Sequence, residues 1–305
     1  MFRMAKSVGR AALLAAMCFA AGVPALASRQ FTDEKGRRIT VPDNPQRVIC
    51  LAPSLTEMTY ALGLGNIIVG VTDFTDDPPE AQKKPSVGNL TGPSFEKIIS
   101  LRPDLILAAA GLNERSTVEQ LDHLGLPVFV VDPHTLDDIL ASVQRVGDVL
   151  NRSREATELV QRLQHQRAAV GARVQGLPRL KVLVLVWYDP VISAGGKSYV
   201  TDVIRAAGAE SVTADLNQVW PEISMEEVIR RAPDYLLLVQ ANHGGVSLKD
   251  LKGRAGWDQL PAVKQGHVIY IGERLIRPSP VVFDALEQLA KQLHPRAFES
   301  GRGDR

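Results

Sequence analysis

Short apolar runs alternate with amphipathic segments along the chain, and this alternation occurs once in each half. The run "RVICLA" at 47–52 predicts a buried strand, and "SLTEMTYALGLG" at 54–65 follows with a serine start and helical spacing. In the second half, "KVLVLVW" at 181–187 and "SYVTDVIRAAGAE" at 198–210 predict the same strand and helix. Strands that alternate with helices predict a mostly parallel sheet in each half.

One phrase is written twice. "SFEKIISLRPDLILA" starts at Ser94 and "SMEEVIRRAPDYLLL" starts at Ser224, and each predicts a capped helix, a Pro-Asp turn and a strand. Each half then closes on another apolar run, "LPVFVVD" or "GHVIYIG". We therefore expect two sister α/β lobes, at 28–135 and 178–295. The identical pairs are Ser94/Ser224, Glu96/Glu226, Ile99/Ile229, Pro103/Pro233, Asp104/Asp234 and Leu107/Leu237.

A helical segment at 136–177 separates the two lobes. Thr135 and Asp138 give it a capping-box start, and its first helix is expected to end at about Leu150. A second helix of about twenty residues follows, which corresponds to a length of roughly 30 Å. The segment is not rich in Gly, Ser or Pro, so a stiff connection is expected. The apolar positions of the second helix are Leu159, Leu163, Val170 and Val174.

Both ends of the chain differ from the lobes. Three cations precede the apolar run at 11–23, and "ALA" at 25–27 closes it, which is the pattern of a cleavable signal peptide at 1–27. The run is short and Pro24 interrupts it, so a retained membrane anchor is not favoured. The expected location is the periplasm. The polar segment 296–305 predicts a flexible tail.

Composition limits the classes of function. The chain is 45% hydrophobic and 23% charged, with 35 basic and 34 acidic side chains, as in a soluble globular protein. Three of the cations lie in the signal peptide, so the rest is near neutral and a nucleic-acid partner is not indicated. Cys50 is the one cysteine after the signal peptide, and its apolar neighbours predict a buried, unreactive thiol.

Motifs of catalysis are absent from the sequence. "AGGKS" at 194–198 resembles a phosphate loop, but Val191 stands where that motif needs glycine. No nucleophile elbow occurs, and the six histidines show no metal-ligand spacing. An enzyme is therefore not expected. The alternative of a periplasmic metal-dependent enzyme would rest on His134 or His243, which follow predicted strands.

Five stretches, found in the same order over most of the chain, carry a family resemblance. They are "RVICLAPSLTEMTYALGLG", "VTDFTDDPPEAQ", "SFEKIISLRPDLIL", "VWPEISMEEVIRRAPDYLLL" and "RPSPVVFDALEQLA". Together they resemble the periplasmic substrate-binding proteins for iron complexes and vitamin B12, and most of all the cobalamin-binding members. The resemblance implies a class III periplasmic binding protein fold, in which one long helix bridges two α/β lobes. It also implies a monomeric carrier, without a cofactor, that delivers its ligand to an inner-membrane ABC permease.

The resemblance gives the repeated glutamates a function. In this family a surface glutamate of each lobe docks on arginines of the two transmembrane subunits, and those positions match Glu96 and Glu226. A dimeric permease offers the same basic socket twice, which calls for the same acid twice. The alternative explanation is local, because an acid in the first turn of a helix also interacts favourably with the helix dipole.

The resemblance also implies a ligand cleft between the lobes, walled by loops at the carboxyl ends of strands. Trp220 matches a tryptophan that packs on the corrin, whereas Leu90 stands where a well-known cobalamin binder has tryptophan. Arg277 and Glu273 match a cleft arginine and its acidic partner. The full set of expected ligand-binding residues is Pro53, Ser54, Phe74, Asp76, Leu90, Trp187, Tyr188, Trp220, Glu273 and Arg277.

Two further alternatives stay open from the sequence. The ligand could be haem, with Tyr188 or His134 offered to the iron, or a ferric siderophore. The protein could also be a sensory or scaffold protein that has kept the fold and lost its transporter.

Overall fold

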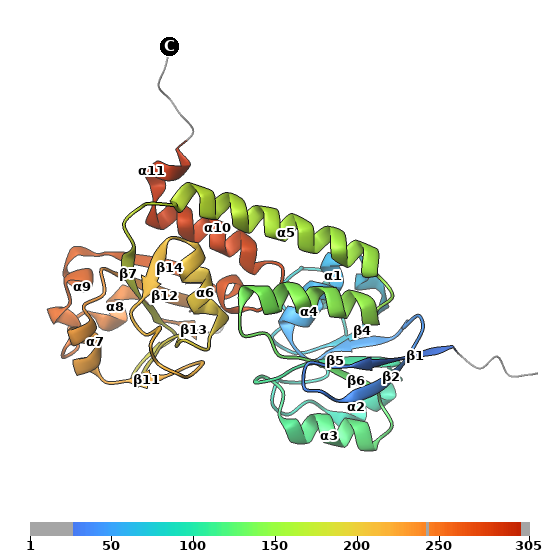
Figure 1. Cartoon of the computed structure of the whole chain (residues 1–305). Helices are drawn as coiled ribbons and strands as arrows, with labels where there is room; N and C mark the ends of the chain where they lie inside the picture. Colours follow the sequence, from blue (N-terminus) through green and yellow to red (C-terminus); the bar gives the residue numbers. More distant parts are fainter. Residues whose placement is uncertain (1–26, 242–243, 300–305) are drawn as a thin grey trace, which may run out of the picture.

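The computed structural model describes residues 27–241 and 244–299. Two α/β lobes lie side by side, and the long helix α5 (Ser153–Val174) extends across both of them (Figure 1). The expected signal peptide lies outside the described residues except for Ala27. Residues 300–305 of the expected tail also lie outside them.

A parallel sheet in the order β4-β3-β5-β6 forms the centre of the first lobe. Its strands are apolar throughout because hydrophobic clusters cover both faces of the sheet. The strands are β3 (Val48–Cys50), β4 (Ile68–Val71), β5 (Leu105–Ala109) and β6 (Val128–Val131). The helices are α1 (Pro53–Ala61), α2 (Phe95–Ser100) and α3 (Arg115–His123), with short 3-10 turns η1 (Gly65–Ile67) and η2 (Ala81–Lys83).

The first lobe begins with an antiparallel hairpin that the sequence did not predict. It consists of β1 (Ser28–Thr32) and β2 (Arg38–Pro42). In its turn, the buried carboxylate of Asp33 accepts hydrogen bonds from the backbone N–H groups of Lys35 and Arg37. Glu34 then accepts the backbone N–H of Asp132, so the hairpin is attached to the segment that follows β6.

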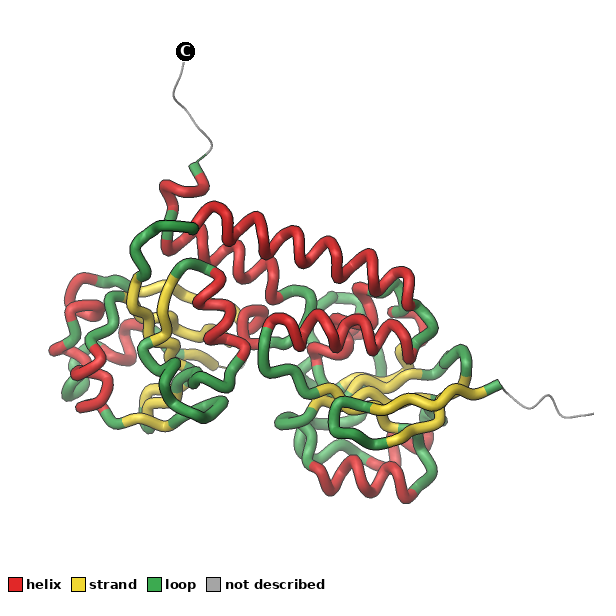
Figure 2. The backbone as a smooth tube through the Cα atoms, in the orientation of Figure 1, coloured by secondary structure: helices red, strands yellow, loops and turns green. Residues whose placement is uncertain are grey.

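The second lobe has the same plan. Its parallel strands are β7 (Leu180–Leu185), β10 (Ala209–Ser211), β12 (Tyr235–Ala241) and β14 (Val268–Gly272), and Figure 2 shows strands at the centre of each lobe. β13 (Gly244–Gly245) pairs with the end of β12, and β8 (Trp187–Tyr188), β9 (Val191–Ile192) and β11 (Glu222–Ile223) form a small separate sheet. The helical segments are α6 (Tyr199–Ala206), α7 (Met225–Arg231), α8 (Leu248–Leu251), η3 (Trp257–Gln259), α9 (Pro261–Gln265), η4 (Glu273–Ile276), α10 (Val282–Leu293) and α11 (Pro295–Phe298).

The two lobes are structural repeats. The order β10-β7-β12-β14 repeats β4-β3-β5-β6, so the strands correspond one to one. The twin phrases form α2 with β5 and α7 with β12. Each helix begins at a serine side chain that accepts a backbone N–H. Each phrase also places a left-handed residue before its proline, Arg102 at φ 46° and Ala232 at φ 44°.

Helices rather than a flexible linker join the lobes. After α4 (Leu136–Val149), whose capping box of Thr135 and Asp138 forms as expected, α5 packs against both α4 and α10. The buried side chains of α5 include all four that the sequence indicated. One continuous hydrophobic cluster contains Val48 of the first sheet and Val182 of the second. The lobes therefore share a core along the bridging helices.

Candidate ligand-binding site

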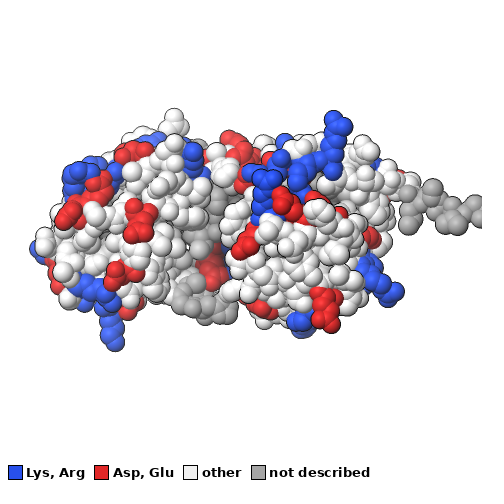
Figure 3. Space-filling view, turned by 90° about the horizontal axis from the view of Figure 1, so that it is seen from below, with Lys and Arg blue, Asp and Glu red and all other residues white. Residues whose placement is uncertain are grey.

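A groove separates the lobes on the side away from α5, and acidic side chains lie at its floor (Figure 3). Polar contacts between the lobes are made by the loops after β4 and β14, for example by Asp77 and Arg274, whose ion pair spans 2.9 Å. Both loops leave the carboxyl ends of their strands. The two sheets therefore present these ends to the same groove, as expected for a two-lobe binder.

Three aromatic side chains that the sequence predicts for the ligand cleft are exposed beyond the ends of β4, β7 and β10. Phe74 follows β4, Trp187 follows β7 and Trp220 follows β10, and each is 40–43% exposed. The fold does not require these three aromatic side chains for its core, which is formed by other residues. Exposed aromatic faces are suited to a flat apolar ligand.

Tyr188 stacks on Trp187 with ring centroids 5.1 Å apart, but it also lines a separate pocket of about 490 Å³. Arg254 lies 4.5 Å above the Tyr188 ring, and its guanidinium donates to the phenol oxygen at 3.4 Å. Glu222 and Met225 also line this pocket. Tyr188 is thus shared between the aromatic pair and a pocket of the second lobe.

Leu90 is partly buried against the main hydrophobic cluster. Its loop is held by Asn113, a buried residue that the sequence analysis did not identify. The Asn113 amide donates to the carbonyls of Leu51 and Leu90 at 2.9 Å, and its oxygen accepts the N–H of Ala109 at 2.8 Å. Asn113 thereby ties three strand-end loops together. A single asparagine in a loop gives no sequence signal for this role.

A cluster of buried and partly buried polar side chains connects the lobes. We call its residues the cross-lobe cluster: Glu57, Asp76, Glu273, Arg277 and Ser279. Arg277 is 9% exposed, and its guanidinium binds three carboxylates. Two of them, Glu57 and Asp76, belong to the first lobe. Glu57 was not nominated from the sequence, where it is one polar residue in a helix.

Burial and charge act in opposite directions in this cluster. Burial raises the pKa of Glu57, although the hydrogen bond from Ser279 and the charge of Arg277 oppose the shift. Burial disfavours the charge of Arg277, but the carboxylates of Asp76 and Glu57 outweigh it and raise the pKa of Arg277. Nearby, burial also raises the pKa of Tyr199, whose buried hydroxyl has no hydrogen-bond partner among the described residues.

Three of the residues predicted to bind ligand are buried. Pro53 and Ser54 form the start of α1 and are buried, and the Ser54 hydroxyl has no partner in the described part of the chain. Arg277 likewise lies within the cross-lobe cluster rather than on the groove wall. The structure therefore leaves Phe74, Trp187 and Trp220 exposed, and it places Pro53, Ser54 and Arg277 beneath the surface.

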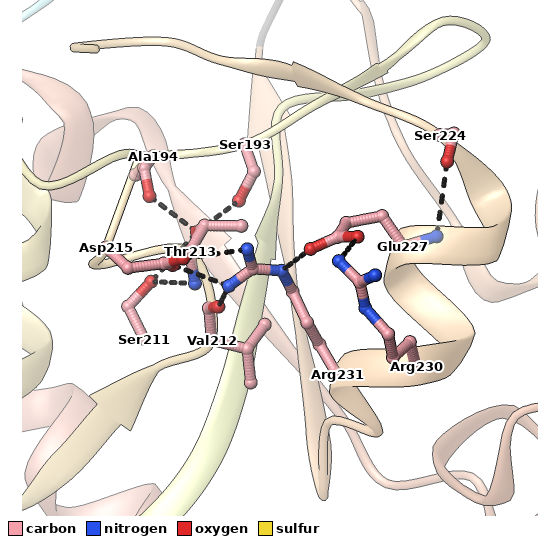
Figure 4. Close-up of polar contacts among 10 residues, drawn as sticks. All are labelled: Ser193, Ala194, Ser211, Val212, Thr213, Asp215, Ser224, Glu227, Arg230 and Arg231. Carbon is pink, nitrogen blue, oxygen red and sulfur yellow. Dashed lines mark hydrogen bonds and ion pairs between the residues drawn. The ribbon is translucent and has the colours of Figure 1, made fainter. Parts of the chain in front are cut away.

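The two repeated glutamates occupy equivalent exposed positions in the first turns of α2 and α7. Within the described residues, neither Glu96 nor Glu226 forms an ion pair. The adjacent Glu227 differs, because Arg230 and Arg231 both bind its carboxylate (Figure 4). The charge of Glu226 is therefore available at the surface, whereas that of Glu227 is compensated.

Metal chemistry finds no support in the described residues. They contain no group of three or more His, Cys, Asp or Glu side chains placed to hold a metal ion. His134 pairs with Asp132 at 3.3 Å, and His243 lies outside the described residues. Over the same residues, no helix has the length and apolar character needed to cross a membrane.

Comparison with known proteins agrees with this geometry. The model of the periplasmic binding protein family matches residues 48–275. A vitamin B12-binding protein of Pectobacterium atrosepticum is 32% identical over 255 residues, which cover 82% of this chain and 88% of that protein. Among solved structures, the periplasmic vitamin B12 binding protein BtuF of Vibrio cholerae has a TM-score of 0.72 at 25% identity and covers 85% of this chain and 100% of its own.

A heme-binding relative is similar to nearly the same degree. The periplasmic heme-binding protein RhuT from Roseiflexus sp. RS-1 has a TM-score of 0.71 at 26% identity, covering 83% of this chain and 99% of its own. Two sister lobes, a helical bridge and a groove between strand ends define an extracytoplasmic solute-binding protein of the class III type. The chain belongs to the periplasmic binding protein family, as an ABC substrate-binding protein of its B12, haem and siderophore branch. This is a family of non-enzymatic solute binders, which decides against the alternative of a metal-dependent enzyme.

Proposed function

We propose that this protein binds cobalamin or a related corrinoid in the groove and delivers it to an inner-membrane ABC permease. The observation that carries the proposal is a set of exposed aromatic side chains that follow sheet strands in both lobes, namely Phe74, Trp187 and Trp220. A corrin is a broad, mostly apolar ring fringed with amides. Aromatic faces above and below such a ring would bury a large apolar area without demanding directional bonds.

The charge beneath the groove supports a corrinoid over haem. Within the cross-lobe cluster, three carboxylates surround one guanidinium, so among these described side chains the acids outnumber the base. Haem propionates, or a ferric complex with net negative charge, would meet this floor with like charge. The amide N–H groups of a corrinoid would instead find carboxylate acceptors in Asp76 and Glu273. Several relatives named as vitamin B12-binding proteins point the same way.

Ligand binding can be tested with the purified protein. Mixed with cyanocobalamin and desalted, it is expected to stay pink and to give a one-to-one binding isotherm by calorimetry. Hemin titrated into the same preparation is expected to give no Soret shift. If the purified protein instead shows a haem Soret band and retains no corrinoid, the corrinoid proposal is wrong and haem is the ligand.

Delivery to the permease is proposed to use Glu96 and Glu226. Three observations support this role: the two glutamates have equivalent places on the sister lobes, both are exposed, and neither has an ion-pair partner in the described residues. Two acids related by the pseudo-symmetry of the lobes would meet two equivalent basic sockets of a dimeric permease. Such contacts chiefly steer the encounter and fix its register.

A further inference from the structure

The cross-lobe cluster joins residues that are far apart in the sequence. The Arg277 Nη1 lies 3.0 Å from the Glu57 Oε1, and these residues are separated by 220 positions. The same nitrogen also donates to Asp76, in the loop that carries Phe74. The other terminal nitrogen binds Glu273, which belongs to the second lobe as Arg277 does. One guanidinium therefore holds its own lobe with one nitrogen and the opposite lobe with the other.

Glu57 is the most deeply buried first-lobe residue that Arg277 binds. It lies on α1, and its side chain is 1% exposed. One carboxylate oxygen accepts from Arg277, and the other accepts the hydroxyl hydrogen of Ser279. Both oxygens of a first-lobe carboxylate are thus bound by second-lobe residues. A buried carboxylate with both oxygens engaged permits little change in position, because any shift leaves a charge without compensation.

A second, outer link runs parallel to the buried one. Arg274 pairs with Asp77 at 2.9 Å, with side chains that are 49% and 30% exposed. Asp76 and Asp77 belong to one loop, and Arg274 and Arg277 lie at either end of η4. The loop that carries Phe74 is therefore attached to the second lobe at two adjacent points, and the arginine of the inner link, Arg277, is much less exposed than Arg274 of the outer link.

We propose that Glu57 is a positioning residue that fixes the separation of the two lobes, and with it the width of the groove, by holding Arg277 and Ser279. Through Asp76 the same cluster sets the position of Phe74 relative to the second lobe. This assignment extends the proposed function, because it makes ligand affinity depend on a residue that does not touch the ligand. Its central consequence, a fixed distance between the lobes, does not depend on which ligand is bound.

The distance can be measured by pulsed electron spin resonance in the ligand-free, full-length protein carrying Cys18→Ser, which leaves Cys50 as its one native cysteine. Spin labels at Gln120→Cys on α3 and Lys264→Cys on α9 report on the two lobes, since both positions are exposed. Cys50 is buried and is expected to remain unlabelled. Glu57→Gln keeps the size of the side chain and removes its charge. Arg277→Met keeps an unbranched apolar side chain and removes the guanidinium group. Both are expected to broaden the distance distribution and shift its mean.

The chain provides a matched control. Arg231 also binds two carboxylates, Asp215 and Glu227, and the carbonyl of Val212, but all of these lie within the second lobe (Figure 4). Arg231→Met is expected to lower the melting temperature and leave the distance distribution unchanged. If Arg277→Met fails to fold, Glu57→Gln and Ser279→Ala still test the link.

Affinity supplies the second measurement. Cyanocobalamin is expected to bind Glu57→Gln about tenfold more weakly than the unmodified protein, and Arg231→Met with unchanged affinity. Unchanged distance distributions in folded Glu57→Gln and Arg277→Met would overturn the inference. Altered distributions in a protein that does not bind cyanocobalamin would instead leave the inference standing and overturn the ligand proposal.

Discussion

Asp104 and Asp234 perform the same structural task in the two lobes. The Asp104 carboxylate accepts the backbone N–H of Arg47 at 2.9 Å, and the Asp234 carboxylate accepts that of Lys181 at 2.8 Å. Arg47 and Lys181 each stand at the start of the central strand of their sheet. The aspartate of the repeated phrase therefore anchors the neighbouring strand, which explains its repetition without any function in binding.

These aspartates are expected to contribute to stability. Asp104→Ala and Asp234→Ala should each lower the free energy of unfolding by about 1–3 kcal/mol, because a charge-assisted hydrogen bond is lost and a backbone N–H loses its partner. The larger loss is expected for Asp104, which also accepts the N–H of Gln46 at 2.8 Å. Urea denaturation followed by circular dichroism measures the difference. Equal stability of Asp104→Ala and the unmodified protein would contradict this role.

The repeated glutamates are expected to behave in the opposite way. Serine, proline and aspartate of the twin phrase all have folding roles, but Glu96 and Glu226 project into solvent. Glu96→Ala combined with Glu226→Ala should abolish transport in cells while leaving the melting temperature and cobalamin affinity unchanged. Uptake of labelled cobalamin in a strain that depends on this protein is the measurement.

The control for this experiment removes the same charge elsewhere. Glu155 and Glu158 lie on α5, away from the groove, in exposed pairs with Arg152 and Arg154. Glu155→Ala combined with Glu158→Ala should support normal uptake, because exposed pairs contribute little to stability. Normal uptake by the Glu96 and Glu226 double variant would refute docking and leave the helix dipole as the reason for the repeated acids.

The fold could be predicted from the sequence because it is decided by local patterns. Apolar runs, serine caps and the doubled phrase each specify one strand, one helix start or one lobe, and the family and the two-lobe architecture are confirmed. The hairpin β1–β2 was missed because its strands are short and half-exposed, with no continuous apolar run. The structure holds the hairpin by burying Ile39 and Val41 in the main hydrophobic cluster and by the hydrogen bonds of the buried Asp33 in its turn.

The site was harder to predict than the fold, because its key contacts join distant positions. Trp220 could be nominated because it matches a family tryptophan and precedes a proline in a polar loop, whereas Trp187 ends an apolar run that predicts a strand. Glu57 and Asn113 could not, since each looks like an ordinary polar residue until the fold brings its partners together. Arg277 was nominated for the cleft, but whether an arginine faces ligand or carboxylates depends on residues 200 positions away.

Aromatic surface is expected to set the affinity for cobalamin. Trp220→Ala should weaken binding by roughly 30-fold, which corresponds to about 2 kcal/mol, a typical loss for an anchoring tryptophan. Leu90→Trp adds an aromatic face at a position where this chain has an aliphatic one, and it should strengthen binding roughly two- to tenfold. Isothermal titration calorimetry measures both. Trp257→Phe is a control in the core, where the tryptophan is 3% exposed, and should alter stability more than affinity.

Cys50 is expected to be chemically inert in the folded protein. Burial raises the pKa of the Cys50 thiol to about 11, although Thr59 and Thr56 lower it slightly. Because the folded pKa lies above the unfolded value, the stabilising difference is present below pH 9 and is lost as the pH rises toward 11. At pH 8, a thiol reagent should label Cys50 only after denaturation, as peptide mapping by mass spectrometry would reveal. Rapid labelling of the native protein would contradict the buried position.

The rigidity of the bridge rests on close packing between α4 and α5, where Gly147 faces Ala156. A Cβ atom on Gly147 would lie 2.3 Å from the Ala156 Cβ and 3.1 Å from the Arg152 carbonyl oxygen, so the helices would have to separate. Gly147→Ala is expected to destabilise the protein by about 1–3 kcal/mol, as overpacking of a core does. It should also change the distance between spin labels on the two lobes, since α5 spans both.

Gly171 provides the opposite case within the same bridge. A Cβ at this position of α5 meets nothing within 4 Å, so an alanine fits without any shift of its neighbours. Gly171→Ala therefore acts mainly by reducing the conformational entropy of the unfolded chain. This variant is expected to stabilise the protein by about 0.4–1 kcal/mol and to leave the lobe separation unchanged. Thermal unfolding and spin-label distances, measured for both Gly147→Ala and Gly171→Ala, distinguish an effect of helix packing from the general effect of replacing glycine by alanine in a helix. A Gly147→Ala variant as stable as Gly171→Ala would mean that α4 and α5 are not tightly packed, and the bridge could then not hold the lobes at a fixed separation.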